Sequence, residues 1–154
     1  MARNLEGRLN SYYPIALSVF RVMFGLLFLC DGLSKLIAWP APDVIAVGQW
    51  PEYYAGWIET ITGALIAVGL FTRAAAFVAS GEMAVAYFTA HLPHGFFPAS
   101  NGGDIAVAYC FAFLLLVFAG GGPYALDARR AGWRSTGAPR RLTGPWRRTR
   151  ARRR

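Results

Sequence analysis

The chain has 154 residues, of which 55% are hydrophobic and 16% are charged. Soluble domains carry about 25% charged residues, so this composition excludes an ordinary water-soluble domain and is typical of an integral membrane protein. The net charge of +8 does not indicate nucleic-acid binding, because 11 of the 16 basic residues form a tail between Arg129 and Arg154. No folded nucleic-acid reader accompanies this tail. We expect it to be attracted to anionic lipid.

The first predicted membrane span covers residues 14–37, after a basic cytoplasmic lead of residues 1–13. This apolar run exceeds the roughly 20 residues that cross a bilayer as a helix. It nevertheless contains Arg21, Asp31 and Lys35. Each charge inside a membrane costs about 2.5–3.5 kcal/mol on insertion scales, so such residues usually face the interior of a helix bundle.

The charged residues of the first span share one helix face with small residues. The spacings of four, three, four and three place five residues on this face: Arg21, Gly25, Phe28, Gly32 and Lys35. The two glycines would let a neighbouring helix approach closely. Asp31 precedes Lys35 by four residues, which favours an ion pair along the helix.

Three shorter apolar runs follow, and they predict helices over residues 54–71, 74–91 and 104–120. Two loops rich in Pro, Gly and aromatic residues separate them, at residues 38–54 and 91–103. The sequence therefore predicts an all-α, four-helix transmembrane bundle over residues 14–127. Residues 128–154 are predicted to be a disordered, Arg-rich cytoplasmic tail.

The distribution of positive charge predicts the orientation of these four spans. The lead, the turn at Arg73 and the tail carry Arg residues, whereas the loops 38–54 and 91–103 carry no Lys or Arg. Since positive charge marks the cytoplasmic side, we expect both termini to lie in the cytoplasm.

Counting residues from the ends of each span predicts which charges lie at one depth. Arg21 and Glu82 share a depth, and we predict a buried structural pair between them. A polar pocket is expected to open outward above this pair, lined by Asp31, Lys35, Glu59, His91 and Asp104. Ionisable residues inside a membrane are candidate functional groups, although these charges could equally serve only to hold the helices together.

The histidines, the cysteines and the aromatic loop are further candidates for binding or chemistry. His91 and His94 flank Pro93 and could bind a metal, but we predict no metal site because loop histidines at an interface are more often surface groups. Cys30 and Cys110 lie at similar depths; buried apolar filling is the simpler role. The aromatic loop 38–54 either anchors the chain at the interface or holds a flat ring such as a quinone.

Four motifs follow one another over residues 15–127. They are Arg21-x3-Gly25-x2-Phe28-x3-Gly32-x2-Lys35, then Glu59-x3-Gly63 with Gly69-Leu-Phe-Thr-Arg73, then Ala86-Tyr-Phe-x2-His91-Leu-Pro-x-Gly-Phe-Phe-Pro98 with Asn101-Gly-Gly-Asp104, and finally Gly120-x2-Pro123-Tyr-x-Leu-Asp127. In this order they resemble the DoxX family of small four-helix bacterial membrane proteins. The resemblance implies a link to quinol oxidation or to thiol-redox complexes, with redox proteins or further copies of the chain as partners.

Three functions are compatible with these features. The first is a membrane subunit or accessory of a quinone-linked or thiol-redox oxidoreductase, in which quinone is the expected ligand, with Glu59, Asp31 and His91 as candidate catalytic groups. The second is a non-catalytic scaffold or assembly factor, in which the charges only join helices. The third is a small-solute carrier, which four short spans without an inverted repeat make less favourable. Whether the chain turns over a substrate stays open.

Overall fold

The computed structural model describes residues 2–42 and 45–130, and for residues 2–8 it describes the backbone alone. All regular secondary structure among the described residues is helical, with no β-strand, which confirms the all-α class. The α-helices are α1 (Ala2–Ile37), α2 (Glu52–Val68), α3 (Thr72–Ala86), α4 (Pro98–Asn101) and α5 (Asp104–Ala119). A π-helical turn, Tyr87–His91, and a short 3-10 turn, Leu92–His94, extend α3.

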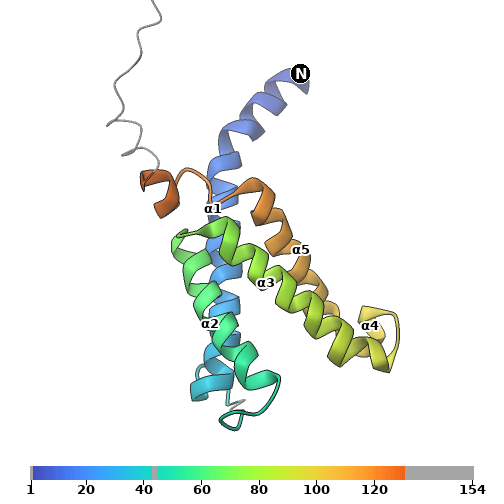
Figure 1. Cartoon of the computed structure of the whole chain (residues 1–154). Helices are drawn as coiled ribbons and strands as arrows, with labels where there is room; N and C mark the ends of the chain where they lie inside the picture. Colours follow the sequence, from blue (N-terminus) through green and yellow to red (C-terminus); the bar gives the residue numbers. More distant parts are fainter. Residues whose placement is uncertain (1, 43–44, 131–154) are drawn as a thin grey trace, which may run out of the picture.

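Two antiparallel helical hairpins make up the bundle (Figure 1). α1 packs along α2, and α3 packs along α5, with α2 and α3 in contact between them. The α1–α2 connection and α4 lie at one end of the bundle, whereas the turn between α2 and α3 and residues 120–130 lie at the other (Figure 1). Consecutive long helices therefore alternate in direction.

When the π-helical turn is counted with α3, the four long helices begin and end within three residues of the predicted spans, except at the start of α1. α1 begins at Ala2, so most of the predicted lead is helical and projects beyond the bundle (Figure 1). Hydropathy could not reveal this extension because residues 2–13 are polar. Of the predicted disordered tail, residues 131–154 lie outside the described part, and residues 128–130 are helical.

Four glycines bring α1 and α2 into backbone contact. A Cβ atom on Gly25 would lie 2.6 Å from the backbone nitrogen of Ala67, and one on Gly63 would lie 2.6 Å from that of Leu29. Nearer the other end of the hairpin, a Cβ on Gly32 would lie 2.7 Å from the Gly56 oxygen, and one on Gly56 would lie 3.2 Å from the Lys35 Cβ. The expectation that small residues on the first span admit a neighbouring helix is confirmed, and that neighbour is α2.

Aromatic side chains fill the space between the two hairpins. The fully buried ring of Phe28 on α1 lies 5.2 Å from the ring of Tyr109 and 4.7 Å from that of Phe113, both on α5. These centroid distances fall within the range of favourable aromatic contacts. They hold α5 against α1 about one turn before Asp31.

Arg21 joins three chain segments at the α2–α3 end of the bundle. This buried guanidinium donates hydrogen bonds to the carbonyl oxygens of Ile66 (2.7 Å) and Ala67 (2.5 Å) and, through Nε, to that of Gly121 (3.0 Å). The last carbonyls of a helix lack partners within the helix and attract cations. The predicted pair with Glu82 is therefore wrong: these carbonyls lie closer, one turn from the end of α2, whereas Glu82 lies deeper along α3.

Asp127 completes this end of the bundle. Its carboxylate accepts hydrogen bonds from the backbone N–H groups of Phe71 (2.9 Å) and Thr72 (2.8 Å) and from the Thr72 hydroxyl (3.0 Å). It thereby caps the N-terminus of α3, where a negative charge is stabilising. In return, the Asp127 N–H donates to the carbonyl oxygen of Gly69 (2.9 Å). We call Arg21 and Asp127, with these partners, the clasp.

The Asp127 carboxylate should make part of the stability depend on pH. Burial raises the pKa of Asp127, but the hydrogen bonds from Thr72 and Phe71 and the charge of Arg130 outweigh burial, so the pKa lies below its usual range. A lowered pKa contributes stability above the unfolded value of about 3.9, and this contribution is lost as the pH falls through the folded value.

We therefore expect Asp127→Asn to lower the free energy of unfolding by about 0.5–2 kcal/mol at neutral pH, the usual effect of losing a helix cap. Thermal unfolding of the purified protein in mild detergent measures this, and the difference from wild type should shrink below about pH 4. Asp104→Asn is the matched control, since Asp104 is exposed on the first turn of α5. Equal stability of Asp127→Asn and wild type at neutral pH would contradict the capping role.

Candidate functional site

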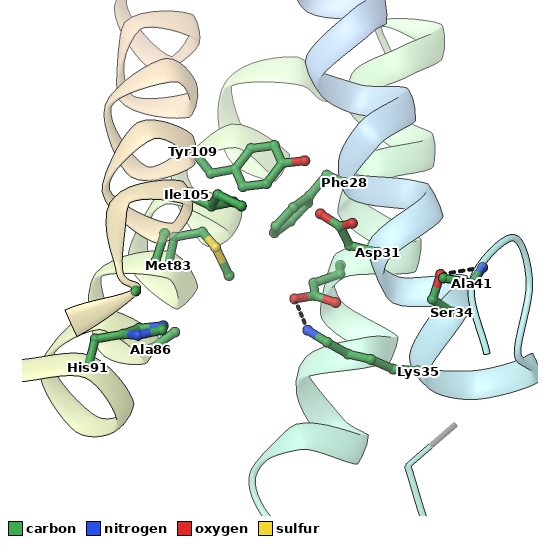
Figure 2. A pocket seen from close by; sticks show the side chains of 13 residues that line it. Phe28, Asp31, Ser34, Lys35, Ala41, Met83, Ala86, His91, Ile105 and Tyr109 are labelled. Carbon is green, nitrogen blue, oxygen red and sulfur yellow. Dashed lines mark hydrogen bonds and ion pairs between the residues drawn. The ribbon is translucent and has the colours of Figure 1, made fainter. Parts of the chain in front are cut away.

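A polar cavity of about 340 Å³ lies between the two hairpins, near the end that carries the α1–α2 connection and α4. Its charged and polar lining comes from α1, α2 and the π-helical turn, and its apolar lining comes mainly from α3 and α5. Figure 2 shows the α1 side chains on one wall and Met83, His91, Ile105 and Tyr109 on the opposite wall. Four of the five residues predicted for a pocket line it: Asp31, Lys35, Glu59 and His91.

Lys35 and Glu59 form an ion pair at the centre of the site (Figure 2). The Glu59 side chain is 2% exposed and the Lys35 side chain is 29% exposed, so the carboxylate is inside the bundle while the ammonium reaches the cavity. The expected helical pair between Lys35 and Asp31 is not the one formed in the described structure. An acceptor on α2 takes the ammonium instead, because both groups lie in the contact between α1 and α2.

Asp31 and Tyr109 face each other across the cavity. The Tyr109 ring crosses from α5 with its hydroxyl directed toward α1, on the side where the Asp31 carboxylate lies (Figure 2). Sequence reasoning missed Tyr109, because nothing in a uniformly apolar run distinguishes a tyrosine on the cavity side from one facing lipid. The ring also stacks on Phe113, with an interplanar angle of 6°, which fixes its direction.

Asp104 is not part of the cavity wall in the described structure. It is the first residue of α5, and its side chain is exposed. The prediction placed it in the pocket because it lies at the same end of the bundle as Glu59. A side chain at the first position of a helix leans away from the helix body, so Asp104 points out of the bundle.

The π-helical turn places His91 in the site. Met83 and Ala86 line the cavity from α3, and regular α-helical spacing would put Ala90 next on that face. The π-turn inserts one extra residue per turn and thereby rotates His91 into this position. The His91 ring is held by Nδ1, which lies 3.2 Å from the carbonyl oxygen of Asn101. His94 is exposed, with its Nδ1 3.0 Å from the carbonyl oxygen of Ala90, and it does not line the polar cavity.

A second, mostly apolar cavity of about 520 Å³ lies on the other side of the ion pair, between α2 and α3. We call it the lateral groove. It shares Lys35, Glu59 and His91 with the polar cavity. Its remaining walls include exposed apolar side chains, namely Trp50, Tyr54, Ile58, Val78 and Val85. The site therefore has one polar side and one apolar side that opens on the outer surface of the bundle.

Three carboxyl oxygens in the site are buried without a hydrogen-bond partner among the described residues: Oε2 of Glu59 and both oxygens of Glu82. Glu82 lines the lateral groove. Leaving buried polar atoms unpaired is costly, and such groups in native structures often mark a ligand or proton site. They are candidate contact points for a bound molecule.

The cysteines are free thiols in the structure. Cys110 lies beside Ser80, whose hydroxyl donates to the Cys110 carbonyl oxygen at 2.9 Å. Cys30 is also half-buried, and neither cysteine lines the polar cavity or the lateral groove. Across residues 2–42 and 45–130, no three His, Cys, Asp or Glu side chains are grouped to hold a metal ion.

The amino-acid sequence is similar to a known family and to a known protein. The family model DoxX matches residues 16–92, which is half of the chain. The chain belongs to the DoxX family. An uncharacterized protein of Haemophilus influenzae is 40% identical over 125 residues, covering 77% of this chain and 93% of that protein. No solved structure matches the chain.

DoxX proteins are membrane proteins, and this chain has the corresponding surface. Residues 9–37 of α1 form one helix that is long and apolar enough to cross a membrane, and α5 is a shorter apolar helix. Large apolar side chains are also exposed on the outer faces of all four long helices, among them Met23, Ile61, Phe77, Phe111 and Phe118. Such a surface is unfavourable in water and suits a lipid environment.

The DoxX motifs gather at the two ends of the bundle. Arg21, Gly69 and Asp127 meet in the clasp. Lys35, Glu59 and His91 meet around the polar cavity. The glycines between these positions set the contact of α1 with α2. The motif residues thus separate into a set that joins helices and a set that surrounds the candidate site.

Proposed function

We propose that this DoxX protein crosses the bacterial inner membrane four times, through α1, α2, α3 with its π-helical turn, and α5, with both termini in the cytoplasm. Three observations support this topology. The long helices alternate in direction, and their outer faces are apolar. The Arg residues of the described chain ends and of the α2–α3 turn lie at the clasp end. In this orientation the polar cavity opens outward.

We propose further that the site binds a quinone and that the protein is a subunit or accessory of a quinone-linked or thiol-redox oxidoreductase system. The observation that carries this proposal is the Lys35–Glu59 pair, which lies between a polar cavity and an apolar groove open to lipid. A lipid-soluble molecule with a polar ring and an apolar tail fits both sides. The Lys35 ammonium fits a carbonyl oxygen of the ring as a donor. The Nε2 atom of His91 and the unpaired oxygen of Glu59 fit the hydroxyl groups of the reduced ring as acceptors, because His91 Nδ1 donates to the Asn101 carbonyl oxygen.

The side chains have distinct roles in this proposal. The Lys35 ammonium positions a carbonyl oxygen of the quinone by donating a hydrogen bond, and Nε2 of the His91 ring accepts one from a hydroxyl of the reduced form. Glu59 and Asp31 take or return protons, since both face the polar cavity and therefore water. A bound quinone would supply two-electron redox chemistry. The described residues form no Cys pair that would take over this role, so a redox protein partner would exchange the electrons.

Lipid extraction and mass spectrometry of the gently purified protein test quinone binding. We expect a stoichiometric quinone in wild type, its loss in Lys35→Ala and Glu59→Gln, and its retention in Asp104→Asn. The last variant removes a charge at the same end of the bundle without touching the cavity wall. Absence of quinone from every sample, together with no binding of added quinone, would overturn the proposal.

A second candidate function is a membrane scaffold or assembly factor. It is favoured by one observation: Arg21, Gly25, Gly63 and Asp127 all act by joining helices. Under this reading, Lys35→Gln would lower stability or the recovery of partner proteins and leave redox rates of the host membrane unchanged. The quinone measurement separates the two functions, because a scaffold has no reason to retain quinone through Lys35.

A further inference from the structure

The lateral groove has the walls of a binding site for an amphipathic molecule that arrives through the bilayer. At about 520 Å³ it lies in the size range of small-molecule sites. Ile58, Val78 and Val85 form exposed apolar walls, and the ring of Trp50 lies 5.5 Å from that of Tyr54 at the outer end. Gly81 adds free space beside Glu82, since a Cβ atom there would meet nothing within 4 Å.

The groove also contains an acid without a counter-charge. Both oxygens of Glu82 are buried and have no hydrogen-bond partner in the described part of the chain. Lys35 is the only Lys or Arg among the described residues that line the groove, and it is bonded to Glu59. Arg21, the other buried cation described, is bonded to backbone carbonyls. The protein therefore offers Glu82 no cation of its own.

We propose that the lateral groove binds a lipophilic organic cation and exchanges it for the proton of Glu82. An isolated carboxylate is too costly to bury without a partner, so Glu82 keeps its proton in the absence of a cation. A positively charged ligand supplies the missing partner, and aromatic rings at the mouth, Trp50 and Tyr54, favour cations. Its apolar body would lie along Ile58, Val78 and Val85. This inference does not depend on the quinone proposal.

The exchange balances as one proton released for each monovalent cation bound. The O–H bond of the Glu82 carboxyl breaks, the proton passes to water, and the carboxylate pairs with the ligand. The titratable and charged groups that face Glu82 are Glu52 and Glu59 from α2, Lys35 from α1 and His91 from the π-helical turn, with Asp31 and Tyr109 beyond the ion pair. Lys35 and Glu59 neutralise each other, so Glu82 is the group that releases the proton when the cation binds.

Tetraphenylphosphonium is a suitable probe because it is lipophilic and carries a permanent charge. We expect calorimetry on the full-length protein in detergent to show tighter binding at about pH 8 than at about pH 6, by up to roughly tenfold per pH unit. Titrations in two buffers of different ionisation enthalpy should show one proton released. Glu82→Gln should abolish binding, Glu82→Asp should retain part of it, and Asp104→Asn should leave it unchanged.

A second measurement uses the wild-type protein and so does not depend on the folding of a variant. An apolar carbodiimide, which reacts with protonated carboxyls, should label Glu82, and tetraphenylphosphonium should protect it in a dose-dependent manner. Peptide mass spectrometry locates the label. Binding that is independent of pH and survives Glu82→Gln would overturn the proposal, as would labelling of Glu82 that the cation does not reduce.

Discussion

Arg21→Ala is expected to be the most damaging single substitution among the charged residues of the helix bundle. It removes a hydrogen-bond donor from three carbonyl oxygens, those of Ile66, Ala67 and Gly121. The Ile66 oxygen still accepts from the Gly69 N–H (3.1 Å), whereas those of Ala67 and Gly121 lose their donor. Each acceptor left unpaired costs about 1–3 kcal/mol, so we expect a loss of at least about 2 kcal/mol. Against a typical total stability of about 5–15 kcal/mol, such a loss would sharply lower the recovery of folded protein.

The yield of monodisperse protein and the unfolding midpoint in detergent measure this effect. Arg21→Lys should recover only part of the stability, because an ammonium lacks the planar fork that reaches several carbonyls at once. Arg73→Ala is the control, since Arg73 is an exposed arginine at the same end of the bundle and should change stability by no more than about 0.5 kcal/mol. If Arg21→Ala behaved like Arg73→Ala, the clasp would not be a principal source of stability.

Gly63→Ala is expected to separate α1 from α2. The added Cβ would lie 2.6 Å from the backbone nitrogen of Leu29 and 2.9 Å from the Gly25 oxygen. Backbone atoms cannot rotate away as a side chain can, so the helices must move apart at a cost of about 1–3 kcal/mol. Because Lys35 and Glu59 belong to the same two helices, we also expect weaker ligand retention in the site.

Gly81→Ala is a closely matched control for the predicted effect on stability. The substitution is the same and also lies within a long helix of the bundle, but the new Cβ meets nothing within 4 Å. Alanine is favoured over glycine in a helix by about 0.5–1 kcal/mol, so Gly81→Ala should be neutral or stabilising. Unfolding of both variants in detergent gives the comparison; equal effects of the two substitutions would show that helix propensity, and not helix contact, decides the outcome.

Features that depend on position along one helix could be predicted from the sequence. The interval from Arg21 to Lys35 fixes one face of α1, and that face does contain the glycines that meet α2. Glu59 and Lys35 could be placed at one depth because residues rise at a constant 1.5 Å along a helix. The role of these residues in binding a ligand stays a prediction.

Features that depend on how helices end could not be predicted. Nothing in the sequence shows that the carbonyls of Ile66 and Ala67 need a donor, so Arg21 was assigned to an acid at the wrong level. His91 reaches the polar cavity through a π-turn, whose extra residue no apolar periodicity announces. Asp104 was misplaced for a related reason, since its direction depends on the point at which α5 begins.

The clasp also limits how the bundle can change shape. It ties α1, the α2–α3 turn and the segment after α5 together at one end, while the candidate site lies toward the opposite end. The two hairpins are therefore linked at the clasp end of the bundle, and the candidate site lies between them near the other end. A rotation of one hairpin about the clasp would displace the residues near Lys35 and His91 the most, because they lie farthest from it.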